Sequence, residues 1–305
     1  MLHGKAKQKV QTMIIVRLMG GLGNQLFQYA LGRRLALERG VKVKFDPKFF
    51  AVVKNRPYAL DNFNTKVEFA SDQEVDEVKG KNLTGIRKRI IYKWQEKLPY
   101  FKRRYVKEAF FEFDPKILEV GKSAYLEGYW QTEKYFEPVA DDLRTELSPL
   151  NPLAPEAVKW DEQIADAPES VSIHLRRGDY VRTPESKEGS SAIQLVYYLD
   201  AIQHMDASLD GPEYFVFSDD IHWAEEHLPK TNKVHFVSHG PEVPDVNDLI
   251  LMSHCRHHIL ANSSFSWWGA WLSTDPGKIV IAPKIWFPDS IRDTEDIYGS
   301  NWVRL

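Results

Sequence analysis

The segment MIIVRLMGGLGNQLFQYALGRRLALERGVKVKFD, residues 13–46, contains a complete strand–helix–strand pattern. A β-branched run at its start leads into glycines, and the apolar stretch from about Asn24 to Arg39 has the length of a helix. Gly40 stands where a helix commonly ends, and VKVKF then alternates with a period of two residues. A βαβ unit of this kind predicts a parallel sheet flanked by helices.

The second half of the chain repeats this theme. SVSIHL, YFVFS, KVHFVS, HHILA and KIVIAP are strand candidates, with helical stretches around residues 190–205, 222–227 and 246–254. The proline-rich stretch LSPLNPLAPEAV breaks both periodicities and predicts a linker. We therefore expect an α/β fold of two Rossmann-like domains with parallel sheets. The expected ranges are a flexible leader over 1–12, an N-terminal domain over 13–150, a C-terminal domain over 151–290 and a C-terminal segment over 291–305.

The middle of the chain, residues 47–149, is less regular. Its stretch IRKRIIYKWQEKLPYFKRRYVKE, residues 86–108, is rich in basic and aromatic side chains. Charge runs usually form solvated faces, which is the first interpretation. The second is a surface on the acceptor side of an enzyme.

Composition restricts the function classes. The 305 residues have a formal net charge of −3, so no global basic field would hold nucleic acid or an anionic membrane by charge alone. Any anion site must be local. Cys255 is the single cysteine, which excludes an intrachain disulfide and a cysteine-based zinc cluster. We expect no transmembrane helix, because no apolar stretch approaches 18 residues, and no signal peptide at the start.

The glycine turn GGLGNQ resembles part of a dinucleotide fingerprint. Gly21 and Gly23 match its first two glycines, and Asp46 stands where a ribose-binding acid is expected. The third glycine position is Leu26, which would keep the helix from approaching the strand closely. Asn24 is a candidate N-cap of the helix, and its amide at a positive helix end also suits a hydroxyl-rich or anionic ligand.

The strand VSIHL ends in two adjacent arginines. His174 and Arg176 should point to one face of the strand and Arg177 to the other. Ligands of open α/β sheets lie beyond the carboxyl ends of strands, and arginine suits phosphate because its planar fork gives two charge-assisted hydrogen bonds. We expect Arg176 to bind a phosphate, while Asp179 pairs with Arg177 and holds the turn at Gly178. The alternative is that both arginines form structural ion pairs.

Polar residues also follow two other strand candidates. Asp219 and Asp220 follow FVFS, where capping of the next helix or ribose contact is favoured over a metal site. Ser263 and Ser264 open a helix and form a candidate anion site, although Ser266 could cap that helix instead.

Two further groups of residues are expected to be structural. Trp267, Trp268 and Trp271 have helical spacing, which is typical of core residues more often than of a ligand platform. The histidines of this region show no metal-ligating pattern; they are His254, His257 and His258.

Four motifs in this order are similar to the α-1,2-fucosyltransferases of glycosyltransferase family 11: GGLGNQLFQYALGRRLA, IHLRRGDY, FVFSDD and NSSFSWWGAWLS. The resemblance runs from about Met13 to Trp286, although the His-x-Arg-Arg-x-Asp core also occurs in other fucosyltransferases. It implies a GT-B-like architecture with an acceptor-side N-terminal domain and a GDP-fucose-binding C-terminal domain. It further implies inverting, metal-independent transfer of L-fucose from GDP-β-L-fucose to the 2-hydroxyl of a terminal β-galactoside.

The resemblance also implies roles for single residues. Arg176 would hold the β-phosphate, and Asn24 would lie close to the reacting sugar. Neither Asp179 nor Glu185 is established as the catalytic base, although both are candidates. Oxocarbenium-like transfer relies on stabilisation of the leaving group, so a strong base is less critical. The donor-binding set is His174 and Asp248 near the guanosine, Ser263 and Ser264 at the diphosphate, and Arg177, Asp219, Asp220, Gly21 and Gly23.

Two other functions remain as alternatives. One is an NAD-dependent oxidoreductase that uses Gly21, Gly23 and Asp46, and the other is a non-catalytic glycan-binding module that uses the tryptophans. The expected partners are GDP-fucose and a galactose-terminated oligosaccharide, with no metal or other cofactor. The expected location is cytoplasmic, with peripheral membrane association left open.

Overall fold

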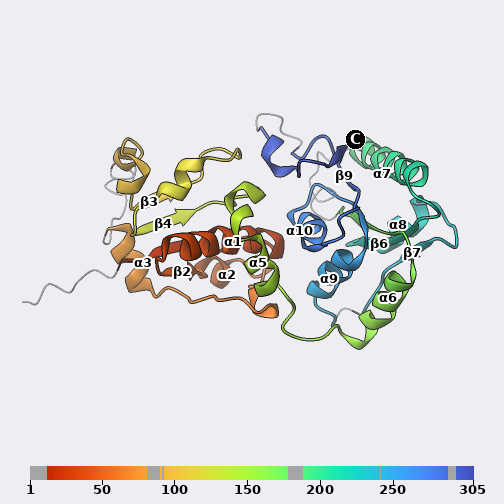
Figure 1. The fold of residues 1–305 in the computed structure, drawn as a ribbon, viewed down its shortest axis with the longest axis horizontal. Helices are drawn as coiled ribbons and strands as arrows, with labels where there is room; N and C mark the ends of the chain where they lie inside the picture. Colours follow the sequence, from red (N-terminus) through yellow and green to blue (C-terminus); the bar gives the residue numbers. More distant parts are fainter. Residues whose placement is uncertain (1–11, 81–89, 91–92, 178–187, 241, 288–292) are drawn as a thin grey trace, which may run out of the picture. The chain divides into compact units, whose positions relative to one another are not determined.

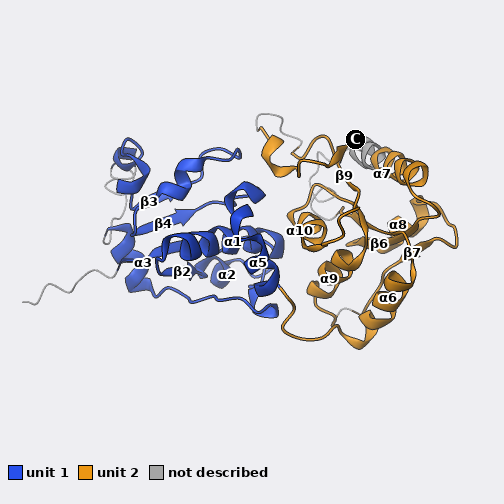
Figure 2. Ribbon diagram, in the orientation of Figure 1, with its two compact units in different colours: residues 1–147 blue, residues 148–305 orange. Residues whose placement is uncertain are grey.

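The computed structural model describes residues 12–80, 90, 93–177, 188–240, 242–287 and 293–305. The chain divides into two compact units, residues 1–147 and 148–305, which are coloured separately in Figure 2. Each unit holds one parallel sheet with helices packed against it, as Figure 1 shows, so the expected α/β fold class is confirmed. The predicted leader lies outside the described residues except for its last position. No described helix is both long and apolar enough to cross a bilayer.

Unit 1 is built on a four-stranded sheet with the order β2-β1-β4-β3, and all its strand pairs are parallel. Both central strands, β1 and β4, are buried. The strands are β1 (Ile14–Arg17), β2 (Val43–Asp46), β3 (Tyr105–Lys107) and β4 (Ala124–Glu127), and the helices are α1 (Leu22–Arg39), α2 (Lys48–Val52), α3 (Asp72–Lys79) and α5 (Ala140–Glu146). Short 3₁₀ helices span Leu60–Asn62, Tyr100–Lys102, Pro115–Glu119, Glu133–Tyr135 and Glu137–Val139.

Helix α1 joins β1 to β2 as the sequence predicts. It ends at Gly40, whose φ of 56° lies in the left-handed region and whose N–H donates to the Ala36 carbonyl. Its start differs from the prediction. The N-cap is Gly21, with no side-chain cap, and Asn24 lies in the first turn of the helix. The prediction of Asn24 as N-cap is therefore wrong, because the chain already turns at Gly20, where φ is 81°.

Unit 2 is built on a six-stranded parallel sheet with the order β10-β9-β8-β5-β6-β7. Its five predicted strands are present, and a sixth pairs with β9, so the last residues belong to this unit instead of forming a separate segment. The strands are β5 (Ser170–Leu175), β6 (Glu213–Ser218), β7 (Val234–Phe236), β8 (His257–Ile259), β9 (Val280–Ala282) and β10 (Val303–Arg304). The helices are α6 (Pro155–Asp166), α7 (Glu188–Ser208), α8 (Ile221–His227), α9 (Val246–His254) and α10 (Ser264–Leu272), and a 3₁₀ turn spans Glu295–Ile297.

The strand order of unit 2 determines where a ligand would bind. From β5 the chain moves outward through β6 and β7, then returns to the other side of β5 and moves outward through β8, β9 and β10. This is the dinucleotide-fold order 3-2-1-4-5-6, with the reversal between β5 and β8. Open parallel sheets bind ligands beyond the carboxyl ends of the strands at this reversal. The loops after β5 and β8 are thus the expected site.

Alternate side chains of the central strands pack on the two faces of the unit 2 sheet. Val171, Ile173 and Leu175 share one buried cluster with residues of α7 and α8. On the other face, Phe215 and Phe217 share a cluster with residues of α6 and α9. Because side chains alternate in this way, we expect the residues that follow β5 to lie near helices of different faces.

Candidate active site

Arg176 and Ser263 meet at the reversal point of the unit 2 sheet. Arg176 directly follows β5, and Ser263 is the N-cap of α10, which begins after β8. The Arg176 guanidinium donates a hydrogen bond of 3.4 Å to the Ser263 hydroxyl, which also accepts from the backbone N–H of Phe265 at 3.3 Å. A guanidinium therefore lies at the positive end of a nine-residue helix, and both features attract an anion. Ser264 is the first residue of this helix.

Of the three serines near the start of α10, the structure shows which one caps the helix. Ser263 occupies that position, whereas the Ser266 hydroxyl donates backward to the carbonyls of Ala261 and Ser263. The alternative in which Ser266 caps the helix is therefore wrong.

Arg177 has a structural environment. Its guanidinium forms an ion pair of 2.7 Å with Asp220 and lies 4.3 Å from the centre of the Trp223 ring. Its backbone N–H donates to Asp219 at 2.9 Å. The expected partner Asp179 lies outside the described residues, and the ion-pair partner that the structure gives is Asp220. Arg176 and Arg177 thus contact the starts of different helices, Ser263 at α10 and Asp220 at α8.

The acidic pair after β6 serves the protein backbone. Asp220 caps α8, because its carboxylate accepts from the Trp223 N–H at 3.2 Å, so the capping interpretation is confirmed. Asp219 instead accepts from the backbone N–H of Arg177, two residues after the neighbouring strand β5. Within the described residues, no group of three or more histidine, cysteine, aspartate or glutamate side chains is placed to hold a metal ion.

His174 is buried against α10. It is 8% exposed, and its ring lies 5.7 Å from that of Phe265. Burial, and next the positive charge of Arg176, lower the pKa of His174 to about 3. The imidazole is therefore neutral at physiological pH and adds no positive charge beside Arg176. Its Nδ1 has no hydrogen-bond partner among the described residues.

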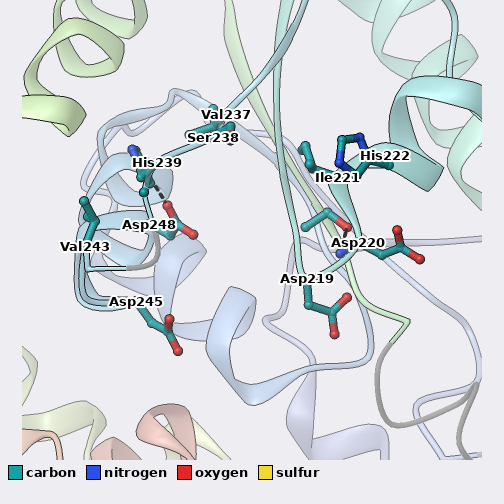
Figure 3. A pocket seen from close by; sticks show the side chains of 12 residues that line it. Asp219, Asp220, Ile221, His222, Val237, Ser238, His239, Val243, Asp245 and Asp248 are labelled. Carbon is teal, nitrogen blue, oxygen red and sulfur yellow. Dashed lines mark hydrogen bonds and ion pairs between the residues drawn. The ribbon is translucent and has the colours of Figure 1, made fainter.

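A polar pocket of about 400 Å³ lies beyond the carboxyl ends of β6 and β7 (Figure 3). Figure 3 shows His239 and Asp248 pointing toward each other, joined by a hydrogen bond of 2.8 Å. Asp219 and Asp220 lie across the pocket from them in this view. The lining residues are Ser218, Asp219, Asp220, Ile221, His222, Val237, Ser238, His239, Gly240, Val243, Asp245 and Asp248.

The acidic lining restricts the kind of ligand that could bind in the pocket. Carboxylates accept hydrogen bonds and repel phosphate, so this pocket suits a ligand rich in N–H and O–H donors. A nucleoside meets that description. Because β5 and β6 are adjacent, the pocket lies next to the cationic helix end at Arg176. Unit 2 thus combines a candidate anion site with a pocket lined by hydrogen-bond acceptors.

His239 is a pocket residue that the sequence interpretation missed. The signal was available, since the stretch FVSHG places polar residues directly after a strand, in the same pattern as Arg176 and Asp219. Trp223 was also missed, because its contact with Arg177 joins a residue of α8 to a residue that follows β5.

The glycine turn of unit 1 does not suit a dinucleotide. Asp46 is 2% exposed, and its carboxylate accepts from the Tyr125 hydroxyl at 2.7 Å and from the Lys48 N–H at 3.1 Å. The carboxylate is thus buried and bonded within the protein. The alternative of an NAD-dependent oxidoreductase therefore loses its ribose-binding acid.

The predicted residues Gly21, Gly23 and Asn24 all belong to this turn of unit 1. Gly21 precedes α1 and Gly23 is buried within its first turn. The amide oxygen of Asn24 accepts a hydrogen bond from Gln131. The neighbouring amide of Gln25 donates to the Pro57 carbonyl and accepts from the Ala59 N–H.

The tryptophans and histidines are structural, as expected. Trp267, Trp268 and Trp271 are at most 6% exposed and pack on one another, so they offer no platform for a glycan-binding module. The three histidines bond to neighbouring side chains: His254 to Asp161, His257 to Glu169 and His258 to Ser172.

Two Rossmann-like units, each built on one parallel sheet, give the chain a GT-B-like fold, and unit 2 carries a candidate anion site and a polar pocket at its strand ends. The model of glycosyl transferase family 11 matches residues 3–305, and the chain belongs to this family.

Known relatives and a solved structure agree with this assignment. The chain is 32% identical to an alpha-1,2-colitosyltransferase of Escherichia coli, over 96% of this chain and 99% of that one. It is 25% identical to galactoside alpha-(1,2)-fucosyltransferase 1 of Ateles belzebuth, over 59% of this chain and 52% of that one. The fold matches NodZ from Bradyrhizobium, an alpha-1,6-fucosyltransferase co-crystallised with GDP, with a TM-score of 0.50 at 15% identity over 85% of this chain and 92% of that one.

Proposed function

We propose that this enzyme transfers L-fucose from GDP-β-L-fucose to the 2-hydroxyl of a terminal β-galactoside, with inversion and without a divalent metal. The observation that carries the proposal is the contact of Arg176 with Ser263 at the reversal point of the unit 2 sheet. There a guanidinium and a helix N-terminus together offer the donors that a departing diphosphate needs.

The pocket supports guanosine as the nucleoside. Guanine presents an N1–H and a 2-amino group on one edge, and one carboxylate can accept from both. Asp248 is a suitable acceptor, because His239 holds one of its oxygens at 2.8 Å and the side chain remains 33% exposed. Adenine presents a ring acceptor in place of the N1–H, so this carboxylate would select against it.

The names of the relatives support the linkage and leave two sugars to distinguish. Both the colitosyltransferase and the galactoside fucosyltransferase carry an α-1,2 designation. Colitose is the 3-deoxy analogue of L-fucose, so the two donors differ by one hydroxyl. We propose fucose as the donor sugar. The candidate bases Asp179 and Glu185 lie outside the described residues, and the proposed contact of Asn24 with the reacting sugar comes from unit 1.

The test is a donor and acceptor panel. Purified protein is incubated with GDP-fucose, GDP-colitose or an ADP-linked sugar, with galactose-terminated and glucose-terminated acceptors, in the presence and absence of EDTA. We expect a 2-O-fucosylated galactoside, an unchanged rate in EDTA and no transfer from the ADP-sugar. Transfer from GDP-colitose alone would overturn the assignment of fucose and retain the guanosine site. A rate that disappears in EDTA would overturn the metal-independent mechanism.

A further inference from the structure

A basic and aromatic segment of unit 1 serves neither the anion site nor the pocket. Residues 93–104, KWQEKLPYFKRR, carry five basic side chains and a single acidic one, in a chain whose net charge is −3. The segment precedes β3, an edge strand of the unit 1 sheet, and is drawn in gold near the β3 label in Figure 1. We call it the basic segment.

Two large apolar side chains of the basic segment face solvent. Trp94 is 61% exposed and Phe101 is 57% exposed. All nine tryptophans lie in the described part of the chain, and Trp94 is the only one classed as exposed. An indole held in water beside cations is a feature of surfaces that contact a partner or a bilayer interface.

The fold holds these side chains outward. Gln95 is 6% exposed, and its amide oxygen accepts from the backbone N–H groups of Arg104 and Tyr105, at 2.9 and 3.0 Å. Arg103 donates to the carbonyls of Leu98 and Glu96, both at 2.7 Å. The backbone around Trp94 is therefore fixed by its own hydrogen bonds, so exposure of the indole does not result from a lack of local structure.

The remaining cations of the basic segment are available at the surface. Lys93, Lys97, Lys102 and Arg104 are exposed, and none of the four forms an ion pair with another described residue. Only Glu96 offers a nearby acidic side chain within the segment. The surface thus combines unneutralised positive charge with an exposed indole and an exposed phenyl ring.

We propose that the basic segment docks the protein on an anionic phospholipid bilayer. Lysine and arginine would contact the headgroup phosphates, while Trp94 and Phe101 would lie at the boundary between headgroups and acyl chains. A second copy of this chain is a poor occupant, because a two-fold contact would place the same cations opposite one another. The inference is independent of the proposed sugar transfer, which uses residues of the strand ends.

The experiment is co-sedimentation of the full-length protein with phosphatidylcholine vesicles, with and without phosphatidylglycerol. We expect at least about tenfold stronger partitioning onto the anionic vesicles, and release as salt is raised. The variant Trp94→Ala/Phe101→Ala should lose about tenfold of this binding, and Lys93→Glu/Lys97→Glu should lose as much or more. Both variants should keep the wild-type midpoint of urea unfolding, because the changed side chains are exposed.

The chain offers a matched control. Phe110 is 74% exposed and is flanked by Glu108 and Glu112, so Phe110→Ala should bind the anionic vesicles as the wild type does. Equal binding of the wild type to both kinds of vesicle would overturn the proposal. The proposal would also be overturned if Trp94→Ala/Phe101→Ala bound as the wild type does while the charge-reversed variant lost all binding. That combination would describe a site for any polyanion, with no insertion of aromatic side chains. A concentration-dependent dimer that Trp94→Ala abolishes would also overturn it, in favour of a second copy.

Discussion

The two parallel sheets place polar residues at the ends of their central strands, but they use them differently. In unit 1, Arg17 pairs with Glu127 at 2.9 Å, and the backbone of Met19 and of Gly128, just after β1 and β4, bonds to the Gln28 amide of α1. In unit 2, Arg176 faces the N-terminus of α10 and an acidic pocket lies beside it. Similar topology therefore yields a loop scaffold in one unit and a candidate nucleotide site in the other.

The difference shows what distinguishes a site from a scaffold. The Gln28 amide, within α1, donates to two backbone carbonyls and accepts from one backbone N–H, so its polar atoms are bonded within the protein. A guanidinium at a helix N-terminus places a positive charge beside the positive end of the helix dipole. A bound anion is attracted by both. Strand-end position alone does not identify a ligand site.

The largest effect is expected at the unit 2 site. Arg176→Ala should lower kcat/KM for the donor by about two to four orders of magnitude, because two charge-assisted hydrogen bonds contribute about 1.5–3 kcal/mol each. Arg176→Lys should recover little, since lysine lacks the planar fork. Steady-state kinetics with varied donor measure this. Arg304→Ala removes a pair with the exposed Glu295 and should leave kcat/KM unchanged. An active Arg176→Ala enzyme would refute the assignment.

The corresponding test of unit 1 concerns stability. Glu146 accepts from the Tyr29 hydroxyl at 2.5 Å and from Arg33 at 2.6 and 2.7 Å, with both partners of the ion pair mostly buried. Glu146→Ala should cost about 3 kcal/mol of unfolding free energy, because the remaining cation and hydroxyl are left unpaired. Urea unfolding measures this. Glu38→Ala, at the partly exposed Arg34 pair, should cost less than about 0.5 kcal/mol.

Neutral burial of His174 predicts a pH dependence. Its pKa is about 3 in the folded protein, so between pH 6.5 and 3 the unfolded chain binds a proton that the native state does not. Stability should therefore fall with pH in this range, and this residue should contribute about 2 kcal/mol of the loss between pH 7 and pH 5. His174→Gln should reduce the loss by that amount in urea titrations at the two pH values. Equal losses in variant and wild type would contradict the buried neutral state.

The smallest effect is expected at the cap of α10. Ser263→Ala should cost about 1 kcal/mol of stability, and Ser263→Gly only a few tenths, because glycine is tolerated at an N-cap. Both should raise the donor KM several-fold, since both lose the hydroxyl beside Arg176. Ser266→Ala should leave the donor KM unchanged, because that hydroxyl donates to backbone carbonyls. A raised donor KM in Ser266→Ala, with no change in the Ser263 variants, would instead assign the donor contact to Ser266.

Elements with a strong local pattern could be predicted from the sequence. The βαβ unit, the end of α1 at Gly40 and the five strands of unit 2 follow from hydrophobic period and glycine placement. Strands β3 and β4 were not predicted, because three or four residues give too short an alternation among basic and aromatic neighbours. The tenth strand was missed for the same reason, since β10 has two residues.

Contacts between distant strand ends could not be predicted. The ion pair of Arg177 with Asp220 joins residues that follow two adjacent strands, and no local pattern around Arg177 points to it. The pairing of His239 with Asp248 likewise joins a strand end to a helix. The polar residues at strand ends could be predicted from the sequence, but their partners could be identified only once the order of strands in the sheet was known.

The most direct test of the central claim is a crystal structure of the protein with GDP. The account predicts that the diphosphate contacts the Arg176 guanidinium and the N-terminus of α10, and that guanine occupies the pocket at Asp248. A diphosphate bound at the Gly20–Asn24 turn of α1, or bridged by a cation to Asp219 and Asp220, would contradict it.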